Sequence, residues 1–155
     1  MFADVANTLR EEDMNTKMLE QANRLIRNYY AAAFGVIDES GRPSVSAIGL
    51  CDPENILELH FTTTLDSNKV KRLEKNNNAS MCCFDDDNNI TLVGTTEIIV
   101  DQETKSKYWQ EWMSKEVPLY PDGETDPNYC IVKFTTKRVS LWLVDEGAEF
   151  TLDWC

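Results

Sequence analysis

The chain has 155 residues and an acidic charge balance, with 27 Asp and Glu residues against 15 Lys and Arg residues and a formal net charge of −12. A surface of this sign repels nucleic acids and anionic membranes, so the composition argues against sequence-independent binding of either. The length fits one domain, which we take to span 1–155. The N-terminus lacks a secretory signal, and the 5 cysteines show no CxxC spacing. The cysteine usage and the missing signal predict a cytoplasmic protein without a membrane span. A single histidine cannot build a His-based zinc site, so no metal site is predicted.

Hydrophobic periodicity changes along the chain from a helical to a strand-like pattern. Met18, Ala22, Leu25 and Tyr29 recur at helical spacing, which predicts an N-terminal helix over about 8–28. Later segments alternate between apolar and polar residues or are short and apolar, as strands are. The predicted strands cover 30–38, 44–50, 56–64, 79–84, 90–100, 129–144 and 149–154, and further helices are predicted from 68 onwards and, behind an Asp101 cap, to about 116.

Six or seven mostly antiparallel strands with few helices favour a β-dominated α+β fold. A small closed barrel is the best interpretation, because closure removes exposed sheet edges. Gly94 interrupts the long strand predicted over 90–100 and indicates a bulge, a bend or a close approach by another group.

The strand predicted over 56–64 runs into a helix whose first turn is cationic. Lys69, Lys71 and Arg72 lie there, although the unpaired N–H groups of a helix start already concentrate positive charge. An anion held by backbone N–H groups, hydroxyls and a lysine explains this placement. Alternatively, Ser67 or Asp66 is an ordinary N-cap and the lysines are solvated. The pattern therefore indicates a phosphate site and leaves the capping interpretation open.

Four segments follow one another in a specific order and spacing. They are Phe61-Thr62-Thr63…Ser67-Asn68-Lys69…Leu73, then Asn78–Phe84, then Ile90–Ile98 around Gly94, and finally Gly123…Asp126-Pro127…Trp142. With these segments the chain resembles the pyridoxamine 5′-phosphate oxidase-like FMN-binding split barrels, especially the general stress protein 26 branch. The resemblance spans about 33–142.

The resemblance implies a homodimer of six-stranded antiparallel split β-barrels with peripheral helices, and one FMN in each of two clefts at the subunit interface. Carried over by position, Ser67 and Lys69 hold the FMN phosphate, and Thr62 and Thr63 supply contacts beside it. The other implied cofactor contacts are Asn68 at the helix start, Val45, Ser46 and Ala47 along the isoalloxazine, and Trp112 and Trp142 as ring or dimer contacts. Ordinary core or interface packing is the alternative for both tryptophans.

Two departures from the family pattern bear on activity. The strand at 44–48 has no basic residue, whereas family members often carry an arginine there that helps to bind the flavin. The full oxidase also has an arginine-rich C-terminal segment, where this chain ends in the acidic segment 145–149. We therefore expect an FMN-dependent oxidoreductase that acts on an unidentified small molecule, with NADH or NADPH as candidate electron donors, and not a true pyridoxamine phosphate oxidase.

Alternative functions stay open within the same fold. One is a non-catalytic flavin-binding stress-response module, and another is a split barrel that uses deazaflavin. Haem is disfavoured, because His60 is the only histidine and would have to be the axial ligand. No catalytic acid or base is assigned, since in flavin enzymes the cofactor carries the redox step. The lack of a recognisable nucleophile–histidine pair argues against hydrolase chemistry.

Overall fold

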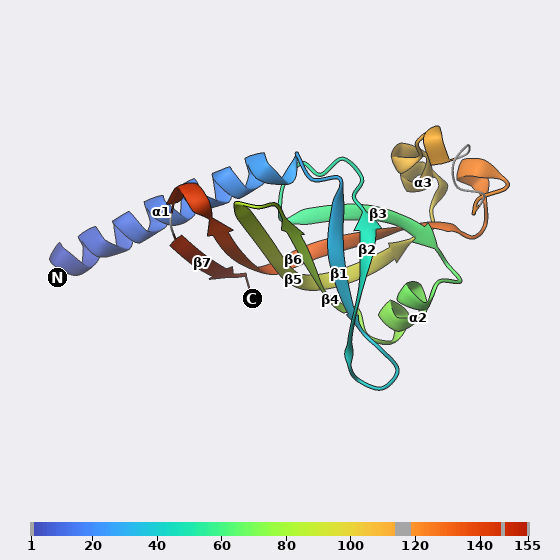
Figure 1. Cartoon of the computed structure of the whole chain (residues 1–155), viewed down its shortest axis with the longest axis horizontal. Helices are drawn as coiled ribbons and strands as arrows, with labels where there is room; N and C mark the ends of the chain where they lie inside the picture. Colours follow the sequence, from blue (N-terminus) through green and yellow to red (C-terminus); the bar gives the residue numbers. More distant parts are fainter. Residues whose placement is uncertain (1, 114–118, 147, 155) are drawn as a thin grey trace.

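The computed structural model describes residues 2–113, 119–146 and 148–154 (Figure 1). Its described residues form one sheet of seven antiparallel strands, in the order β2-β1-β4-β5-β6-β3, with β7 paired to β6 outside this path. The strands are β1 (Ala31–Ile37), β2 (Pro43–Gly49), β3 (Glu58–Thr64), β4 (Asn78–Phe84), β5 (Asn88–Ile99), β6 (Tyr129–Leu143) and β7 (Ala148–Asp153). The predicted β-dominated fold is confirmed. Strands β1 to β6 make the barrel, and β7 pairs with the second half of β6 as an additional strand.

The barrel is split between β2 and β3, which are the two ends of the strand order. In the part of the chain that the structure describes, the sheet joins these ends only through an antiparallel bridge between Leu50 and Phe61. Elsewhere along this seam, no strand among the described residues pairs with the facing edges of β2 and β3. Unpaired edges expose backbone N–H and C=O groups, so they can bind a ligand or another chain.

The inner faces of the strands form the main core. Phe34, Phe61 and Phe134 are all 0% exposed, and the ring of Phe34 lies 4.8 Å from that of Phe61 and 6.4 Å from that of Phe134, centroid to centroid, in edge-on geometry. Burial of one such ring contributes about 1.5–3 kcal/mol relative to leaving it exposed. Because Phe61 is also the bridge residue, the same packing holds the end of the split together.

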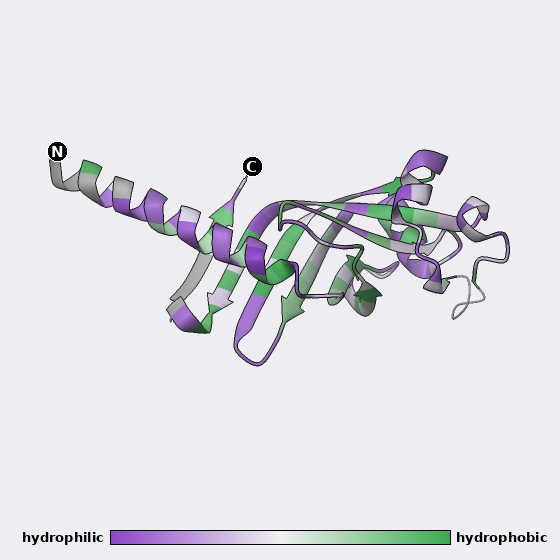
Figure 2. Cartoon of the chain, turned by 90° about the horizontal axis from the view of Figure 1, so that it is seen from above, coloured by the Kyte–Doolittle hydropathy of each residue, from purple (hydrophilic) through white to green (hydrophobic). Residues whose placement is uncertain are grey.

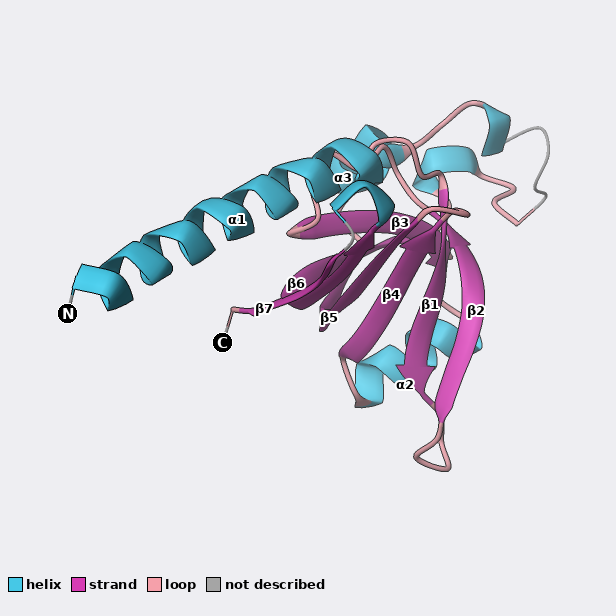
Figure 3. Cartoon of the chain, turned by 60° about the vertical axis from the view of Figure 1, so that its left-hand side comes forward, coloured by secondary structure: helices cyan, strands magenta, loops and turns pink. Residues whose placement is uncertain are grey.

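Helix α1 (Phe2–Ile26) begins earlier than the predicted boundary near residue 8. Its last turns cover the barrel. Met18 and Ala22 are buried in the core as the periodicity predicted, Ile26 is buried beside them, and Leu25 and Tyr29 are partly buried against the core. The N-terminal half projects away from the barrel (Figures 1 and 3). Figure 2 shows that α1 is mostly hydrophilic, whereas the strands carry hydrophobic stretches. None of the described helices is long and apolar enough to span a bilayer.

Helix α3 (Gln102–Tyr108) is shorter than predicted, because Trp109 leaves the helical conformation with ψ of 135°. The predicted Asp101 N-cap is confirmed by its bond from the Thr104 amide, at 2.9 Å. The ring of Trp109 packs edge-on against Tyr129 at 5.3 Å between centroids, in a second buried cluster. Tertiary packing therefore overrides the helical periodicity here. Residues 112–113 are helical again, and 114–116 lie outside the described residues.

Of the alternatives given for Gly94, a bulge is confirmed, since the pairing of β5 with β6 shifts register between Val93 and Gly94. A Cβ atom at this position would lie 2.0 Å from the Thr135 carbonyl oxygen. Only glycine permits the two backbones to approach this closely.

Candidate functional site

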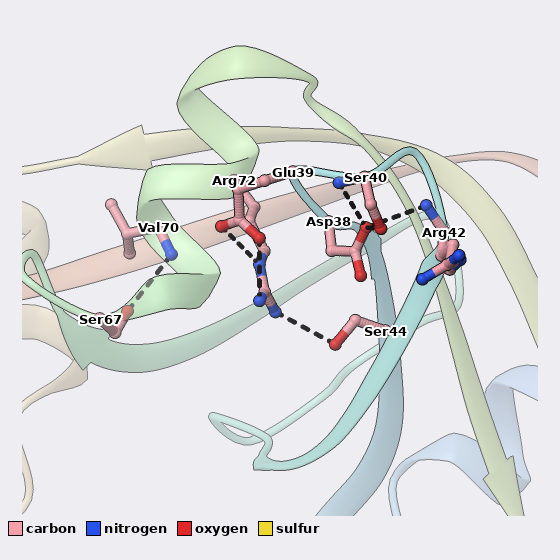
Figure 4. Close-up of polar contacts among 8 residues, drawn as sticks. All are labelled: Asp38, Glu39, Ser40, Arg42, Ser44, Ser67, Val70 and Arg72. Carbon is pink, nitrogen blue, oxygen red and sulfur yellow. Dashed lines mark hydrogen bonds and ion pairs between the residues drawn. The ribbon is translucent and has the colours of Figure 1, made fainter.

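The predicted site residues lie on the two sides of the split. Val45, Ser46 and Ala47 are on β2, whereas Thr62 and Thr63 are on β3. Helix α2 (Asn68–Lys75) follows β3 after a short turn and reaches back across the seam, because the Arg72 guanidinium Nη1 donates to Ser44 Oγ of β2 at 3.1 Å (Figure 4). This bond places Arg72, in the second turn of α2, beside the beginning of β2.

Ser67 caps α2, which confirms the capping alternative for this residue. Its Oγ accepts from the Val70 amide at 3.2 Å (Figure 4). A hydroxyl that accepts one bond still has a proton to donate, so capping leaves Ser67 able to donate to an anion. The preceding Asp66 is held from outside the helix, because Asn128 Nδ2 donates to its carboxylate at 3.1 Å. No acidic residue occupies the first turn of α2.

Lys69 is a half-buried cation at this helix start. Its Nζ lies 5.5 Å from the centroid of the buried Phe61 ring. Burial lowers the pKa of Lys69 below its ordinary value of 10.5, and among the described residues no carboxylate offsets that loss of hydration. A desolvated lysine without a compensating anion is poised to bind one.

The other cations of the first turns have different roles. The guanidinium of Arg72 binds both carboxylate oxygens of Glu39, at 3.1 and 3.2 Å, and so ties α2 to the turn between β1 and β2. That turn is itself fixed, because Asp38 accepts bonds from Ser40 and from the Arg42 amide (Figure 4). Of the three predicted cations, Arg72 is paired with Glu39 and Lys71 is exposed. Lys69 is therefore the candidate to bind an anion at the helix start.

Two adjoining cavities open beside the edge of β2. The first, which we call the sheet cavity, is about 500 Å³ and is lined by Tyr29, Tyr30, Ala31, Ala32, Ala33, Val45, Ser46, Ala47, Cys82 and Phe84. The second, the end cavity, is about 640 Å³ and is lined by Tyr30, Ala31, Ala47, Ile48, Gly49, Leu50, Cys51, Asp52, Thr62, Gln110, Trp112, Met113, Leu119 and Tyr120. The two linings share Tyr30, Ala31 and Ala47, and we call the two cavities together the hollow. Their mostly apolar walls and their volumes suit a flat aromatic ligand.

Half of the predicted site residues line this hollow, namely Val45, Ser46, Ala47, Thr62 and Trp112. Thr63 and the helix-start residues Ser67, Asn68 and Lys69 lie outside both linings, farther along β3 and α2. Trp142 is not brought to the site within one chain. It lies in the second half of β6, opposite Asn89 and Glu149, beyond the segment that pairs with β3.

Sequence reasoning missed several residues that line the hollow. Tyr29 was assigned to the helical face, but its hydroxyl donates to Asp85 Oδ2 at 2.5 Å and its ring lines the sheet cavity. Phe84 follows the alternation of β4 onto the outer face, which strand parity could have revealed. Asp52 in the end cavity has a φ of 33°, a left-handed conformation that is uncommon outside glycine.

His60 lies in a third cavity of about 310 Å³, apart from Val45, Ser46 and Ala47. Its Nδ1 is 3.0 Å from the Tyr108 hydroxyl, and the two rings stack at 4.6 Å between centroids. Burial lowers its pKa. Among the described residues, no three His, Cys, Asp or Glu side chains are placed to hold a metal ion.

An antiparallel barrel that is split between β2 and β3, with helix α2 bonded across the split to β2 and cavities along the β2 edge, fits the split-barrel class. The family model described as pyridoxamine 5′-phosphate oxidase like matches residues 17–152. The chain belongs to this family. No curated protein matches it.

Solved structures agree with this fold. A protein related to general stress protein 26, from Clostridium acetobutylicum, is 26% identical, with a TM-score of 0.75 over 88% of this chain and 94% of its own. A pyridoxamine 5′-phosphate oxidase-related, FMN binding protein from Nostoc punctiforme is 12% identical, with a TM-score of 0.56 over 90% of this chain and 94% of its own. A heme binding protein from Mycobacterium smegmatis is 12% identical, with a TM-score of 0.64 over 88% of this chain and 57% of its own.

Proposed function

We propose that the protein binds FMN at the split of the barrel. The observation that carries this proposal is Lys69, a half-buried cation at the start of α2. Burial lowers its pKa, and among the described residues no carboxylate stabilises its charge. A phosphate of about −1.5 to −2 charge suits a lysine combined with the free N–H groups of a helix start. The family membership and the FMN binding relative support the same ligand.

The residues divide between the two parts of the cofactor. Lys69, the Ser67 hydroxyl and the backbone at Asn68 would hold the phosphate, with Thr62 and Thr63 beside it. The edge of β2 at Val45, Ser46 and Ala47 would lie along the isoalloxazine, and Trp112 would contact the ring from the end cavity. The apolar walls would exclude water from the ring, and the free N–H and C=O groups of β2 would hydrogen-bond to its polar edge.

Bound FMN would supply two-electron redox chemistry, which supports a flavin-dependent oxidoreductase that takes electrons from NADH or NADPH. No acid or base of this chain is assigned a proton-transfer role. A flavin-binding module without turnover predicts bound FMN that neither nicotinamide bleaches under anaerobic conditions. A deazaflavin remains the alternative with the same phosphate chemistry. Haem is disfavoured, because Nδ1 of His60 faces Tyr108 and its Nε2 is 3.5 Å from a Glu58 carboxylate oxygen.

We further propose a homodimer in which each cofactor lies between two subunits, with Trp142 available to the partner's site and not to its own. Dilution to monomer should then release the flavin. Flavin retained by a monomeric protein would contradict the shared site.

The decisive experiment compares FMN with riboflavin, which lacks the phosphate, by calorimetric titration of the apo-protein. Lys69→Met keeps an unbranched apolar side chain against Phe61 and removes the charge. We expect it to weaken FMN binding by about 1.5–3 kcal/mol, the scale of a hydrogen bond to a charged group, and to leave riboflavin binding unchanged. Lys71→Met, on the exposed side of α2, is the matched control. Equal FMN affinities for the two variants would remove Lys69 from the site.

A further inference from the structure

The end cavity carries a single charge of its own. Asp52 is the one charged residue among the described residues that line it, and the rest of the lining is mostly apolar or aromatic. The Asp52 carboxylate forms no hydrogen bond or ion pair with another described residue, although Asp52 also lines the third cavity, which contains Lys107. A carboxylate that no protein cation neutralises is available to a positively charged ligand.

Tyr120 adds a hydroxyl without a partner to the same cavity. The residue is 8% exposed, and its ring packs edge-on against Trp109 and Tyr129, at 6.0 and 4.9 Å between centroids. Burial raises the pKa of Tyr120 to about 12, so the hydroxyl is neutral at physiological pH. It bonds to no described residue, whereas every fully buried side-chain polar atom in the described part of the chain has a partner. The hydroxyl therefore reaches the cavity that Tyr120 lines, where it can bond to a ligand.

Two large aromatic side chains complete the wall of the end cavity. Tyr30 is 85% exposed and Trp112 is 48% exposed, and both line it. Aromatic rings attract organic cations through their negative faces, in addition to their hydrophobic contact with the apolar body of a ligand. The net charge of −12 also raises the concentration of cations near the protein. The carboxylate, the aromatic walls and the overall charge thus favour the same ligand chemistry.

We infer that the end cavity binds a small organic cation, namely a protonated amine with an apolar or aromatic body and no phosphate. The ammonium group pairs with Asp52, and the body of the ligand lies against Tyr30 and Trp112. The Tyr120 hydroxyl is available to a polar substituent. An anionic group on the ligand is not accommodated, because no lysine, arginine or histidine among the described residues lines this cavity.

This inference deepens the proposed function by giving a class of substrate. Tyr30, Ala31 and Ala47 line both cavities, so an amine in the end cavity would lie beside the isoalloxazine proposed for the edge of β2. Its role as a substrate rests on the proposed function, whereas its binding needs no flavin and is tested on the apo-protein. A protein that binds amines at Asp52 and no FMN would retain the amine site and refute the proposed function. A protein that binds FMN and no amine would do the reverse.

The first test titrates the apo-protein with phenethylamine and with 2-phenylethanol, a neutral analogue of nearly the same shape, by ligand-observed NMR. We expect the wild type to prefer the amine. Asp52→Asn removes the charge and keeps a residue type that tolerates the φ of 33° at this position. It should weaken amine binding about three- to tenfold, the scale of a partly exposed charged contact, and leave alcohol binding unchanged. Asp86→Asn makes the same change on the exposed turn between β4 and β5 and should bind as the wild type does. Equal amine affinities for the two variants, or a wild type that binds the alcohol as tightly as the amine, would overturn the inference.

The second test locates the amine in the end cavity by adding a competing cation. Leu119 lines this cavity and not the sheet cavity, is 55% exposed and is not an assigned flavin contact. Leu119→Lys should weaken phenethylamine binding at least about tenfold, because its ammonium group repels the ligand and competes for Asp52. Leu57→Lys makes the same change at a 48% exposed position outside both linings and should bind the amine nearly as the wild type does. If the two lysine variants bind phenethylamine equally, the amine lies elsewhere and the inference is wrong. Far-ultraviolet circular dichroism establishes that each variant is folded.

Discussion

The close approach of β5 and β6 at Gly94 makes a quantitative prediction about Gly94→Ala. The added Cβ would lie 2.0 Å from the carbonyl oxygen of Thr135 and 2.9 Å from its carbonyl carbon. Carbon and oxygen in contact need more than about 3 Å, so the strands must separate by roughly 1 Å. Both obstacles are backbone atoms, which cannot rotate away as a side chain does.

The expected cost combines lost hydrogen bonds with strain. Separation by roughly 1 Å, against a strand spacing of about 4.8 Å, disrupts about two ladder bonds worth about 1 kcal/mol each. Overpacking adds about 1–3 kcal/mol. We therefore expect Gly94→Ala to lower the free energy of unfolding by about 3–5 kcal/mol, and the melting temperature by about 6–20 °C for a chain of this size.

Urea unfolding followed by circular dichroism measures this cost, and two other glycines calibrate it. A Cβ at Gly49 meets nothing closer than 3.9 Å, so Gly49→Ala should change stability little. A Cβ at Gly35 lies 2.8 Å from Ser80 Oγ, a side-chain atom that can rotate, so Gly35→Ala should be intermediate. If Gly94→Ala and Gly49→Ala unfold at the same urea concentration, the account of the bulge is wrong.

Three other predictions concern the helix start and its ion pair. Ser67→Ala should cost about 1 kcal/mol of stability through the lost N-cap, a loss similar to that of Asp101→Ala at α3, as measured by urea unfolding. FMN affinity should fall as the pH rises through the pKa of Lys69, which burial places below 10.5, because only the protonated lysine attracts phosphate; riboflavin affinity should not follow this profile. The bonds from Arg72 lower the pKa of Glu39, so this carboxylate contributes stability at neutral pH that is lost as the pH falls from its ordinary value of 4.5 through the lowered one. Glu39→Gln should reduce the acid sensitivity of unfolding in that range, and an unchanged pH profile would contradict the stabilising role of the pair.

Much of the fold could be predicted because its signals are local. The alternation of Leu59 and Phe61, the turn around Gly41 and the interruption at Gly94 each report on their own strand. The end of α3 could not be predicted in this way. Trp109 leaves the helix to pack against Tyr129, a contact that joins residues far apart in the chain.

Part of the candidate site could be proposed from the sequence because its signals are also local. Ser67 and Lys69 could be selected because a helix start is a local pattern. The ion pair that occupies Arg72 could not be predicted, because its partner Glu39 lies on the distant turn between β1 and β2. The sheet cavity depends on which residues of β1, β2 and β4 face the same side, so Tyr29 and Cys82 gave no signal on their own. Trp142 matches the family pattern, and the structure places it away from the other predicted residues.

The position of the split also affects how the protein folds. β2 and β3 are close in sequence, yet β3 finds its main partner in β6, with Thr62 opposite Ile131, a separation of roughly 70 residues that makes this pairing slow. The β1–β2 and β4–β5 hairpins can form from local contacts long before this. We therefore expect the seam to close late, so that a partly folded chain has hairpins and a hydrophobic cluster but no place for a ligand. A ligand that binds at the seam would then stabilise only the fully assembled barrel and would slow its unfolding without speeding its folding.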